Sequence, residues 1–187
     1  MRKLILVAQI SLDGFVAGPG GTFEHFVDGE NSLGFVCSLT ESADAGLFGR
    51  VTFDMLQAHW PTAADKPGAT PNIIRYGNWY NKATKIVLSR TLENNTNAVI
   101  VHENISDSIQ AIKQQEGRDI LLFGSPTAFN ALLKLNVVDT CWLIVHPVLF
   151  ADGIPLFKEG RTPQKLVHIQ SQQLPGGLMA LQYNTSE

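Results

Sequence analysis

Short apolar runs that alternate with helix-like segments constrain the fold of this chain more than any other feature. Residues 3–10 (KLILVAQI) form a continuous run rich in branched side chains, which is typical of a strand covered on both faces. Comparable runs recur at 45–49, 85–89, 97–102 and 119–124, and segments with helical spacing separate most of them. This order predicts an α/β domain with a mostly parallel, twisted central sheet.

Capping and turn signals set the remaining elements. Ser106 and Ser125 suit helix caps, and Pro126 suits the first helical position, where a missing N–H costs nothing. Glycines and prolines mark residues 11–21 and 61–71 as loops. The pattern predicts helices at 32–42, 50–60, 72–82, 106–117 and 125–136.

The end of the chain differs from the rest. Residues 139–150 predict one long strand, and two final strands joined through residues 175–177 predict an antiparallel hairpin at the edge of the sheet. The 187 residues contain no internal repeat and no linker, so we expect a single domain over residues 1–187.

Bulk properties exclude several classes of protein. The net charge of −3 gives no electrostatic reason to bind nucleic acid or an anionic membrane, and no run reaches the ~18 apolar residues of a membrane helix. Gln9, Ser11 and Asp13 interrupt the first apolar run, unlike a secretory signal. Cys37 and Cys141 lie in apolar settings and the five histidines are scattered, so we expect a reducing cytoplasm and no metal site.

Three strand ends carry the chemistry. Each combines groups suited to an anion: Gly49-Arg50 with Thr52, Ser89-Arg90-Thr91, and Gly124-Ser125 with Thr127. Each has an ordinary alternative, such as a surface ion pair for the arginine at 50 or simple helix capping for the serine at 125. The sequence contains neither the GxGxxG dinucleotide-binding fingerprint nor a GK[ST] phosphate-binding loop. Parallel neighbours would nevertheless bring all three ends to one edge of the sheet, which favours a shared anion site.

Five motifs in order extend this reading to the whole chain. They are SLDGFVAGPGG, LFGRVTFDML, KIVLSRTL, ILLFGSPTAFNALL and VVDTCWLIVHPVLFADGIPLF. Over residues 2–183 the chain resembles the dihydrofolate-reductase-like family, in the branch named after the C-terminal reductase domain of the bifunctional riboflavin-biosynthesis deaminase/reductase. The resemblance implies a three-layer fold with about eight strands and an antiparallel edge, and NADPH as cofactor. With no deaminase or zinc signature upstream, a stand-alone member is expected.

The resemblance also implies roles for particular residues. Asp13 matches a carboxylate near the substrate, and Glu24 is a second candidate catalytic group. The region that holds the pterin carboxylate of true dihydrofolate reductases offers Glu24, Asp28 and Glu30 without a matching motif, which weakens the implication of folate reduction. The implied cofactor contacts are Ala8, Val16, Ala17 and Gly18 at the nicotinamide, Gly49, Arg50 and Thr52 on the phosphates, Ser89 and Arg90 at the adenosine, and Gly124, Ser125 and Thr127 at the pyrophosphate.

The expected activity is hydride transfer from NADPH to a C=N or C=O group of a pterin- or ribosylaminouracil-like substrate, with Asp13 or Glu24 positioning it or relaying a proton. Two alternatives remain: a non-catalytic nucleotide-binding module that retains the cofactor cleft, and a structural α/β dimer whose arginines form ion pairs only. The apolar C-terminal strands favour a homodimer, and no nucleic-acid or membrane partner is expected.

Overall fold

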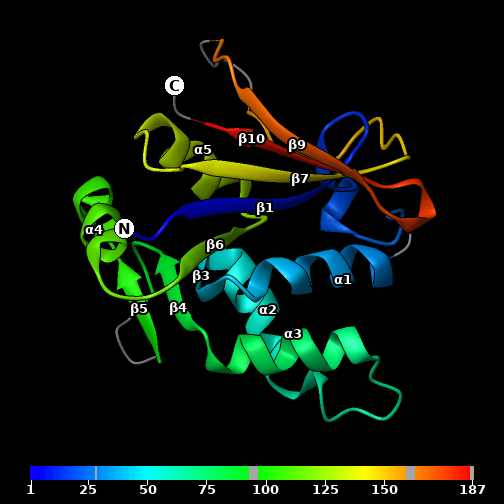
Figure 1. Ribbon diagram of the computed structural model, residues 1–187, viewed down its shortest axis with the longest axis horizontal. Helices are drawn as coiled ribbons and strands as arrows, with labels where there is room; N and C mark the ends of the chain where they lie inside the picture. The colour runs from blue at the N-terminus through cyan, green and yellow to red at the C-terminus, as the bar shows by residue number, and fades with distance from the viewer. Residues whose placement is uncertain (28, 93–96, 159–162, 186–187) are drawn as a thin grey trace.

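An eight-stranded sheet forms the centre of the computed structural model, which describes residues 1–27, 29–92, 97–158 and 163–185 (Figure 1). Asp28 therefore lies outside the described residues. The strand order is β5-β4-β3-β6-β1-β7-β10-β9. The strands are β1 (Leu4–Ser11), β3 (Ala43–Gly49), β4 (Thr84–Leu88), β5 (Ala98–Val101), β6 (Asp119–Phe123), β7 (Thr140–His146), β9 (Val167–Gln173) and β10 (Met179–Asn184).

Pairing within the sheet confirms the expected topology. Every pair of neighbouring strands from β5 to β7 in the sheet order is parallel, whereas β10 is antiparallel to both β7 and β9. The turn Pro175–Gly177 joins β9 to β10, so the C-terminal hairpin forms the edge as predicted. In register, Gly49 lies opposite Leu88, and Leu88 lies opposite Val101, so the carboxyl ends of β3, β4 and β5 are level.

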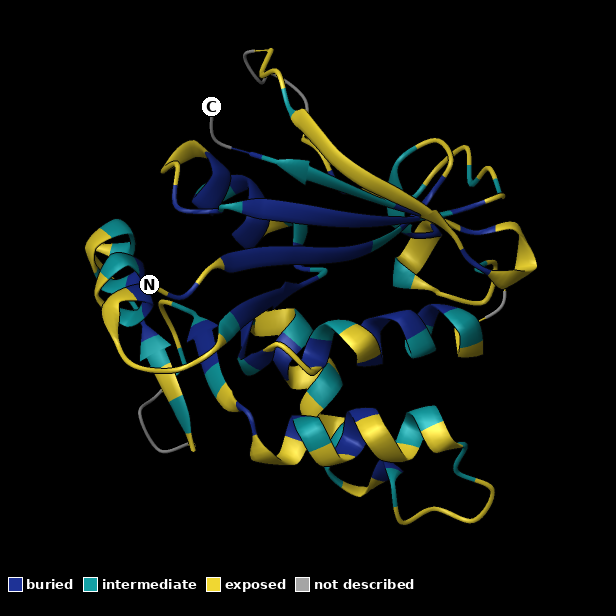
Figure 2. Ribbon diagram, in the orientation of Figure 1, coloured by how far each residue is buried: buried dark blue, intermediate teal, exposed yellow. Residues whose placement is uncertain are grey.

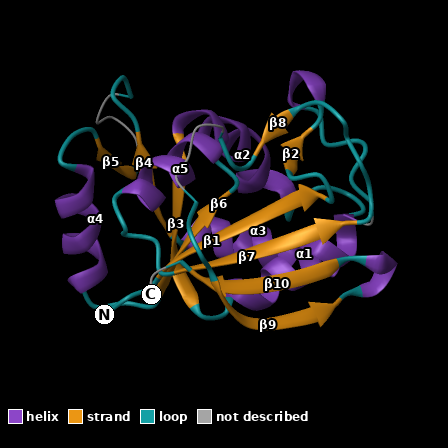
Figure 3. Cartoon of the chain, turned by 90° about the horizontal axis from the view of Figure 1, so that it is seen from above, coloured by secondary structure: helices purple, strands orange, loops and turns teal. Residues whose placement is uncertain are grey.

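Helices cover both faces of the sheet, which explains the unbroken apolar run from Leu4 to Ala8 in β1. Helices α1 (Gly29–Thr40), α2 (Arg50–Ala63) and α3 (Pro71–Lys82) pack on one face, and α4 (Ile105–Gln114) and α5 (Pro126–Lys134) on the other. In β1, Leu4 and Leu6 face α4 and α5, while Ile5 and Val7 face the other three helices. Figure 2 shows the buried strands between the layers, and Figure 3 shows α1 and α3 behind the sheet.

Two helix caps and one strand end differ from the sequence prediction. Helix α4 begins after Asn104, whose φ of 46° is left-handed, so Ser106 lies inside the helix and is not its cap. Ser125 does precede α5, but its side chain makes no cap hydrogen bond. Strand β7 ends at His146 because the chain turns there, with Val148 N–H donating to the His146 carbonyl at 2.8 Å.

A second, smaller sheet was not predicted. Strand β2 (Phe15–Ala17), inside an expected loop, pairs antiparallel with β8 (Ile154–Pro155). Its three residues are too few to show a period of two in the sequence. Helix α2 also extends to Ala63 through Pro61, past the proline that predicted its end. Cys37 and Cys141 are buried and free, as their apolar surroundings predict. Within the described residues, no helix is both long and apolar enough to cross a membrane.

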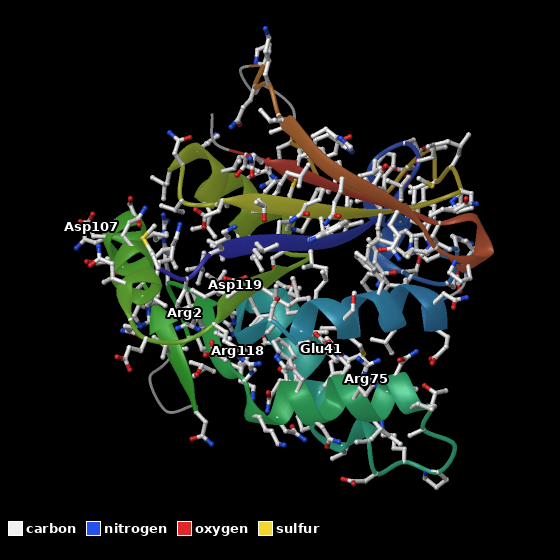
Figure 4. All side chains as sticks on the ribbon, viewed as in Figure 1. Arg2, Glu41, Arg75, Asp107, Arg118 and Asp119 are labelled. Atoms are coloured by element: carbon white, nitrogen blue, oxygen red, sulfur yellow. The ribbon has the colours of Figure 1, made fainter. Side chains whose placement is uncertain are left out.

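Ion pairs concentrate at the amino-terminal ends of the strands. The Arg2 guanidinium bonds to the Asp44 carboxylate, and the Asp44 carboxylate also accepts the backbone N–H of Arg118 at 2.9 Å. Lys113, only 2% exposed, pairs with Asp139 at 2.7 Å. Figure 4 shows Arg2, Arg118 and Asp119 together at this edge, with Glu41 and Arg75 between α1 and α3. This edge is thus fixed by charge, and the opposite, carboxyl edge is available for a ligand.

Removing one partner of the buried pair should destabilise the fold. Asp139 also accepts the N–H of Leu4 at 2.7 Å, so Asp139→Ala leaves Lys113 buried without its carboxylate and β1 without that contact. We expect the free energy of unfolding in urea to fall by about 3 kcal/mol. As a control, Glu41→Ala removes an exposed pair with Arg75 and should cost under about 1 kcal/mol. Equal losses in the two variants would contradict a special role for the buried pair.

Candidate functional site

A cleft of about 1130 Å³ opens at the carboxyl ends of the parallel strands. Its walls come from the ends of β3, β4, β5 and β6, from β1, and from helices α1, α2, α3 and α5. The strand order places β4 and β3 toward one end of this cleft and β1 toward the other. The two ends differ in chemistry, and we refer to them as the polar end and the apolar end.

The polar end gathers the three predicted strand ends. The residues after β3, β4 and β6 that line it are Gly49, Arg50, Thr52, Ser89, Arg90, Thr91, Gly124, Ser125 and Thr127, joined by His102 after β5. Their meeting follows from parallel pairing, because all these strands end on the same edge. The sequence-based prediction of a shared edge is therefore confirmed as geometry, while cofactor binding by these residues stays a prediction.

One hydrogen bond ties two of these junctions together. The backbone N–H of Gly49 donates to the Ser125 hydroxyl at 2.9 Å, linking the start of α2 to the start of α5. Gly124 and Ser125 both have positive φ, 51° and 29°, which is uncommon for serine and directs the turn. Helix α2 follows Gly49, which has no side chain, and the Ser125 hydroxyl before α5 is engaged with Gly49. Neither helix therefore has a side-chain cap, and first-turn N–H groups of both remain for a ligand.

Arg50 forms an ion pair and also lines the cleft. Its guanidinium donates to the Thr91 hydroxyl and lies 3.5 Å from the Asp54 carboxylate, one helical turn further along α2. The ordinary reading as a helix-surface ion pair is therefore correct, and yet the same side chain lines the cleft. Arg90 also lines the cleft and makes no ion pair with any described residue. Two guanidinium groups thus occur at the polar end.

The small β2–β8 sheet holds the loop expected at the nicotinamide. Val16 and Ala17 line the cleft, and Gly153 at φ 145° lets the β8 segment cross close to Ala17, where a Cβ would meet its carbonyl at 2.2 Å. Gly18 does not line the cleft; its N–H donates to the Thr22 carbonyl. Ala8 packs in the core on the α4 and α5 side, so its side chain is not part of the cleft wall.

The two carboxylates predicted as catalytic do not line the cleft. Asp13 accepts the Ser11 hydroxyl at 2.6 Å, the N–H of Phe150 at 3.1 Å and the N–H of Ala151 at 2.8 Å. It thereby joins the loop after β1 to the loop after β7. The Ser11 hydroxyl and these N–H groups lower the pKa of Asp13 to about 2, so it is ionised and a poor proton donor at neutral pH. Glu24 is exposed and lies 3.7 Å from His25.

The lowered pKa of Asp13 predicts a pH-dependent contribution to stability. A folded-state pKa of about 2, against an ordinary value of 3.8, stabilises the fold above pH 3.8, and that stabilisation is lost as the pH falls through about 2. Asp13→Asn removes the charge while keeping a similar shape. In urea unfolding between about pH 5 and pH 2, the stability difference between wild type and variant should therefore shrink toward acid. A difference that stays constant would contradict this role.

The apolar end was not identified from sequence. It is lined by Val7, Phe26, Val36, Leu56, Tyr76 and Phe123, with Gln9 among them. These side chains have the spacing of core residues, and nothing in a single sequence separates a cleft wall from a core face. One signal was available: Gln9 interrupts an otherwise apolar strand. Its amide oxygen accepts a hydrogen bond from His146 Nε2 at 3.0 Å.

Comparison with known proteins shows the same architecture elsewhere. The family model described as the RibD C-terminal domain matches residues 2–180. The protein YyaP of Bacillus subtilis (strain 168), itself uncharacterized, is 27% identical over 184 residues, which cover 98% of this chain and 95% of YyaP.

Solved structures agree with this match at the level of the fold. A Shewanella sp. PV-4 protein provisionally assigned to riboflavin biosynthesis superposes with a TM-score of 0.75 at 23% identity, over all of both chains. The Thermotoga maritima diaminohydroxyphosphoribosylaminopyrimidine deaminase/5-amino-6-(5-phosphoribosylamino)uracil reductase superposes with a TM-score of 0.68 at 15% identity, over 98% of this chain and 56% of that one. This chain therefore corresponds in extent to about half of the bifunctional protein.

Proposed function

Because the chain belongs to the family of the RibD C-terminal domain, we propose that it is an NADPH-dependent reductase that delivers hydride to a C=N or C=O carbon of a small substrate. The observation that carries the proposal is the polar end of the cleft, where three strand ends bring two guanidinium groups, several hydroxyls and two uncapped helix starts together. This donor set suits a dinucleotide with several phosphates.

The residues present fit such a cofactor. Arg50 and Arg90 supply permanent positive charge, and the hydroxyls of Thr52 and Thr127 make no hydrogen bond to another described residue. We assign Arg50 and Thr52 to phosphate groups, Ser89 and Arg90 to the adenosine end, and Gly124 to Thr127 to the pyrophosphate. Val16 and Ala17 would border the nicotinamide, with the backbone of Ala8 nearby.

The protein's part in the reaction is placement. When bound, NADPH supplies the hydride. The apolar walls exclude water from the space beside the nicotinamide. They also hold the reacting carbon of the substrate face to face with the cofactor. The Gly49–Ser125 hydrogen bond fixes the two helix starts at the polar end, so the phosphates hold the rest of the cofactor in one position. In this proposal Asp13 supports the loop beside the cleft and is not the proton donor.

Titration with cofactor tests the proposal. Adding protein to NADPH should give a saturable change in nicotinamide fluorescence at micromolar concentration, and NADP⁺ should compete. Oxidation of NADPH should then depend on an added C=N or C=O compound. If no saturable change occurs even at high micromolar cofactor, the cleft does not bind a nicotinamide dinucleotide and the proposal is wrong.

Arg50→Ala measures the phosphate contact directly. Loss of a charge-assisted hydrogen bond should weaken NADPH binding by about 1.5–3 kcal/mol, and should penalise NADPH more than NADH if the 2′-phosphate is its target. Arg75→Ala is a matched control, because Arg75 is half-exposed on α3, pairs with Glu41 and does not line the cleft. The two variants should differ in fluorescence titrations. Unchanged NADPH affinity in Arg50→Ala would return this arginine to a surface ion pair.

A non-catalytic nucleotide-binding module is the second candidate. One observation favours it: neither predicted catalytic carboxylate lines the cleft. Saturable NADPH binding without oxidation, across pterins, ribosylaminouracils and simple carbonyls, would support it over the reductase.

A homodimer is part of the same proposal. Strand β9 is the last in the sheet order, and all seven of its residues are exposed, including Val167 and Ile169 (Figure 2). A second copy packed against the face of β9 that carries Val167 and Ile169 would cover these side chains. Sedimentation equilibrium of the purified protein should give twice the mass of the chain. We also propose that the enzyme is cytoplasmic.

A further inference from the structure

Among the described residues, the apolar end of the cleft has no cationic group to receive an anionic substrate. Its walls are Val7, Phe26, Val36, Leu56 and Phe123, and no lysine or arginine of the described chain lines that end. Both guanidinium groups of the cleft lie at the other end, after β3 and β4. Moving a phosphate from water into an apolar wall without a counter-charge is strongly unfavourable. A phosphorylated substrate is therefore poorly matched to these walls.

The hydroxyl of Tyr76 is a polar group of the apolar end that makes no hydrogen bond to any residue that the structure describes. Tyr76 is 3% exposed and lines the cleft. The centroid of its ring lies 4.3 Å from that of Trp60 and 5.8 Å from that of Phe123. Its hydroxyl makes no hydrogen bond to any described residue, although a buried tyrosine usually finds an acceptor. Burial raises the pKa of Tyr76 well above its ordinary value, so the hydroxyl stays protonated and can donate.

Gln9 adds a second uncharged donor. The fully buried His146 donates from Nε2 to the Gln9 amide oxygen at 3.0 Å, which fixes the orientation of the amide. The His146 ring is itself packed 4.5 Å from Phe26. The amide nitrogen of Gln9 makes no hydrogen bond to another described residue, and the residue lines the cleft. Tyr76 and Gln9 thus both offer uncharged donors to the cleft.

We propose that the apolar end binds an uncharged, planar carbonyl or imine compound that carries no phosphate, and that the Tyr76 hydroxyl donates to its oxygen or nitrogen. The assignment rests on the proposed function, since it names the substrate class for the same cleft. The proposed substrate differs from the phosphoribosyl compound after which the Thermotoga maritima structural relative is named. Hydrophobic walls hold the ring of the substrate, and Tyr76 sets which end of it faces the cofactor.

The step balances with the groups named. Hydride from NADPH forms the new C–H bond at the carbonyl carbon, and the electron pair of the C=O π bond moves to oxygen. That oxygen takes a proton from the bulk solvent as the product leaves the cleft, so that the carbonyl compound, NADPH and one proton give an alcohol and NADP⁺. Tyr76 donates a hydrogen bond to the oxygen as its charge develops and keeps its own proton, in accord with its high pKa.

Tyr76→Phe tests the hydroxyl while leaving the ring in place. With 4-nitrobenzaldehyde or isatin as the neutral probe, kcat/KM should fall about tenfold, as expected for one lost hydrogen bond, with NADPH affinity unchanged. Tyr80→Phe is the matched control: Tyr80 lies one turn further on α3, is 1% exposed, and donates to Gln57 at 3.0 Å outside the cleft lining. It should leave kcat/KM for both probes unchanged. Equal effects of the two variants would overturn the role of Tyr76.

A matched substrate pair tests the absence of a phosphate site. Ribosylaminouracil with and without its 5′-phosphate should be compared as substrates, or as competitors of isatin at saturating NADPH. We expect the phosphate to lower the affinity for the compound or leave it unchanged, and the neutral probes to bind with the highest affinity. Tighter binding of the phosphorylated compound would overturn it, as would cofactor binding with no binding or reduction of either neutral probe.

The two proposals fail in different ways. Absence of NADPH binding in the fluorescence titration removes the reductase itself. Normal NADPH binding together with preference for the phosphorylated compound leaves the reductase intact and removes only the uncharged-substrate assignment.

Discussion

Parallel pairing of β3, β4 and β6 is the constraint on which the cleft depends. It brings three chain segments to one edge of the sheet, and there the Gly49 N–H donates to the hydroxyl of Ser125, 76 residues further along the chain. That hydrogen bond occupies Ser125 and so prevents it from capping α5. Two helix starts are left open toward the same space, beside Arg50 and Arg90. The opposite edge is fixed by ion pairs such as that of Lys113 with Asp139.

Much of this arrangement could be predicted from sequence. Continuous apolar strands predict a sheet covered on both faces, and alternating helices predict parallel pairing; both are confirmed. Ten of the twelve predicted cofactor residues line the cleft. Eight of them lie at the three strand ends that the pattern of elements predicts, and the other two, Val16 and Ala17, were implied by the family resemblance. Ala8 and Gly18 do not line it: a shift of one residue along a strand changes the face, as Val7 and Gln9 on either side of Ala8 show.

The remainder depended on contacts between distant segments. Asp13 was predicted as catalytic, but its carboxylate bonds to Phe150 and Ala151, and nothing local in the sequence shows that partnership. The β2–β8 sheet is too short to have a sequence period, and Tyr76 has the spacing of a core residue on α3. What distinguishes Tyr76 is the absence of a described partner for its hydroxyl, which only three-dimensional packing reveals. The substrate half of the cleft is for this reason less visible in sequence than the cofactor half.

The central claim is that one cleft holds a nicotinamide dinucleotide across the ends of β3, β4 and β6. A crystal structure of the protein with NADP⁺ tests it most directly. The account predicts density for the pyrophosphate between Arg50 and the Gly124–Thr127 turn, with the nicotinamide beside Ala17 and the apolar end left open for a substrate. Density for the dinucleotide elsewhere on the molecule, or with its phosphates away from both helix starts, would contradict the account.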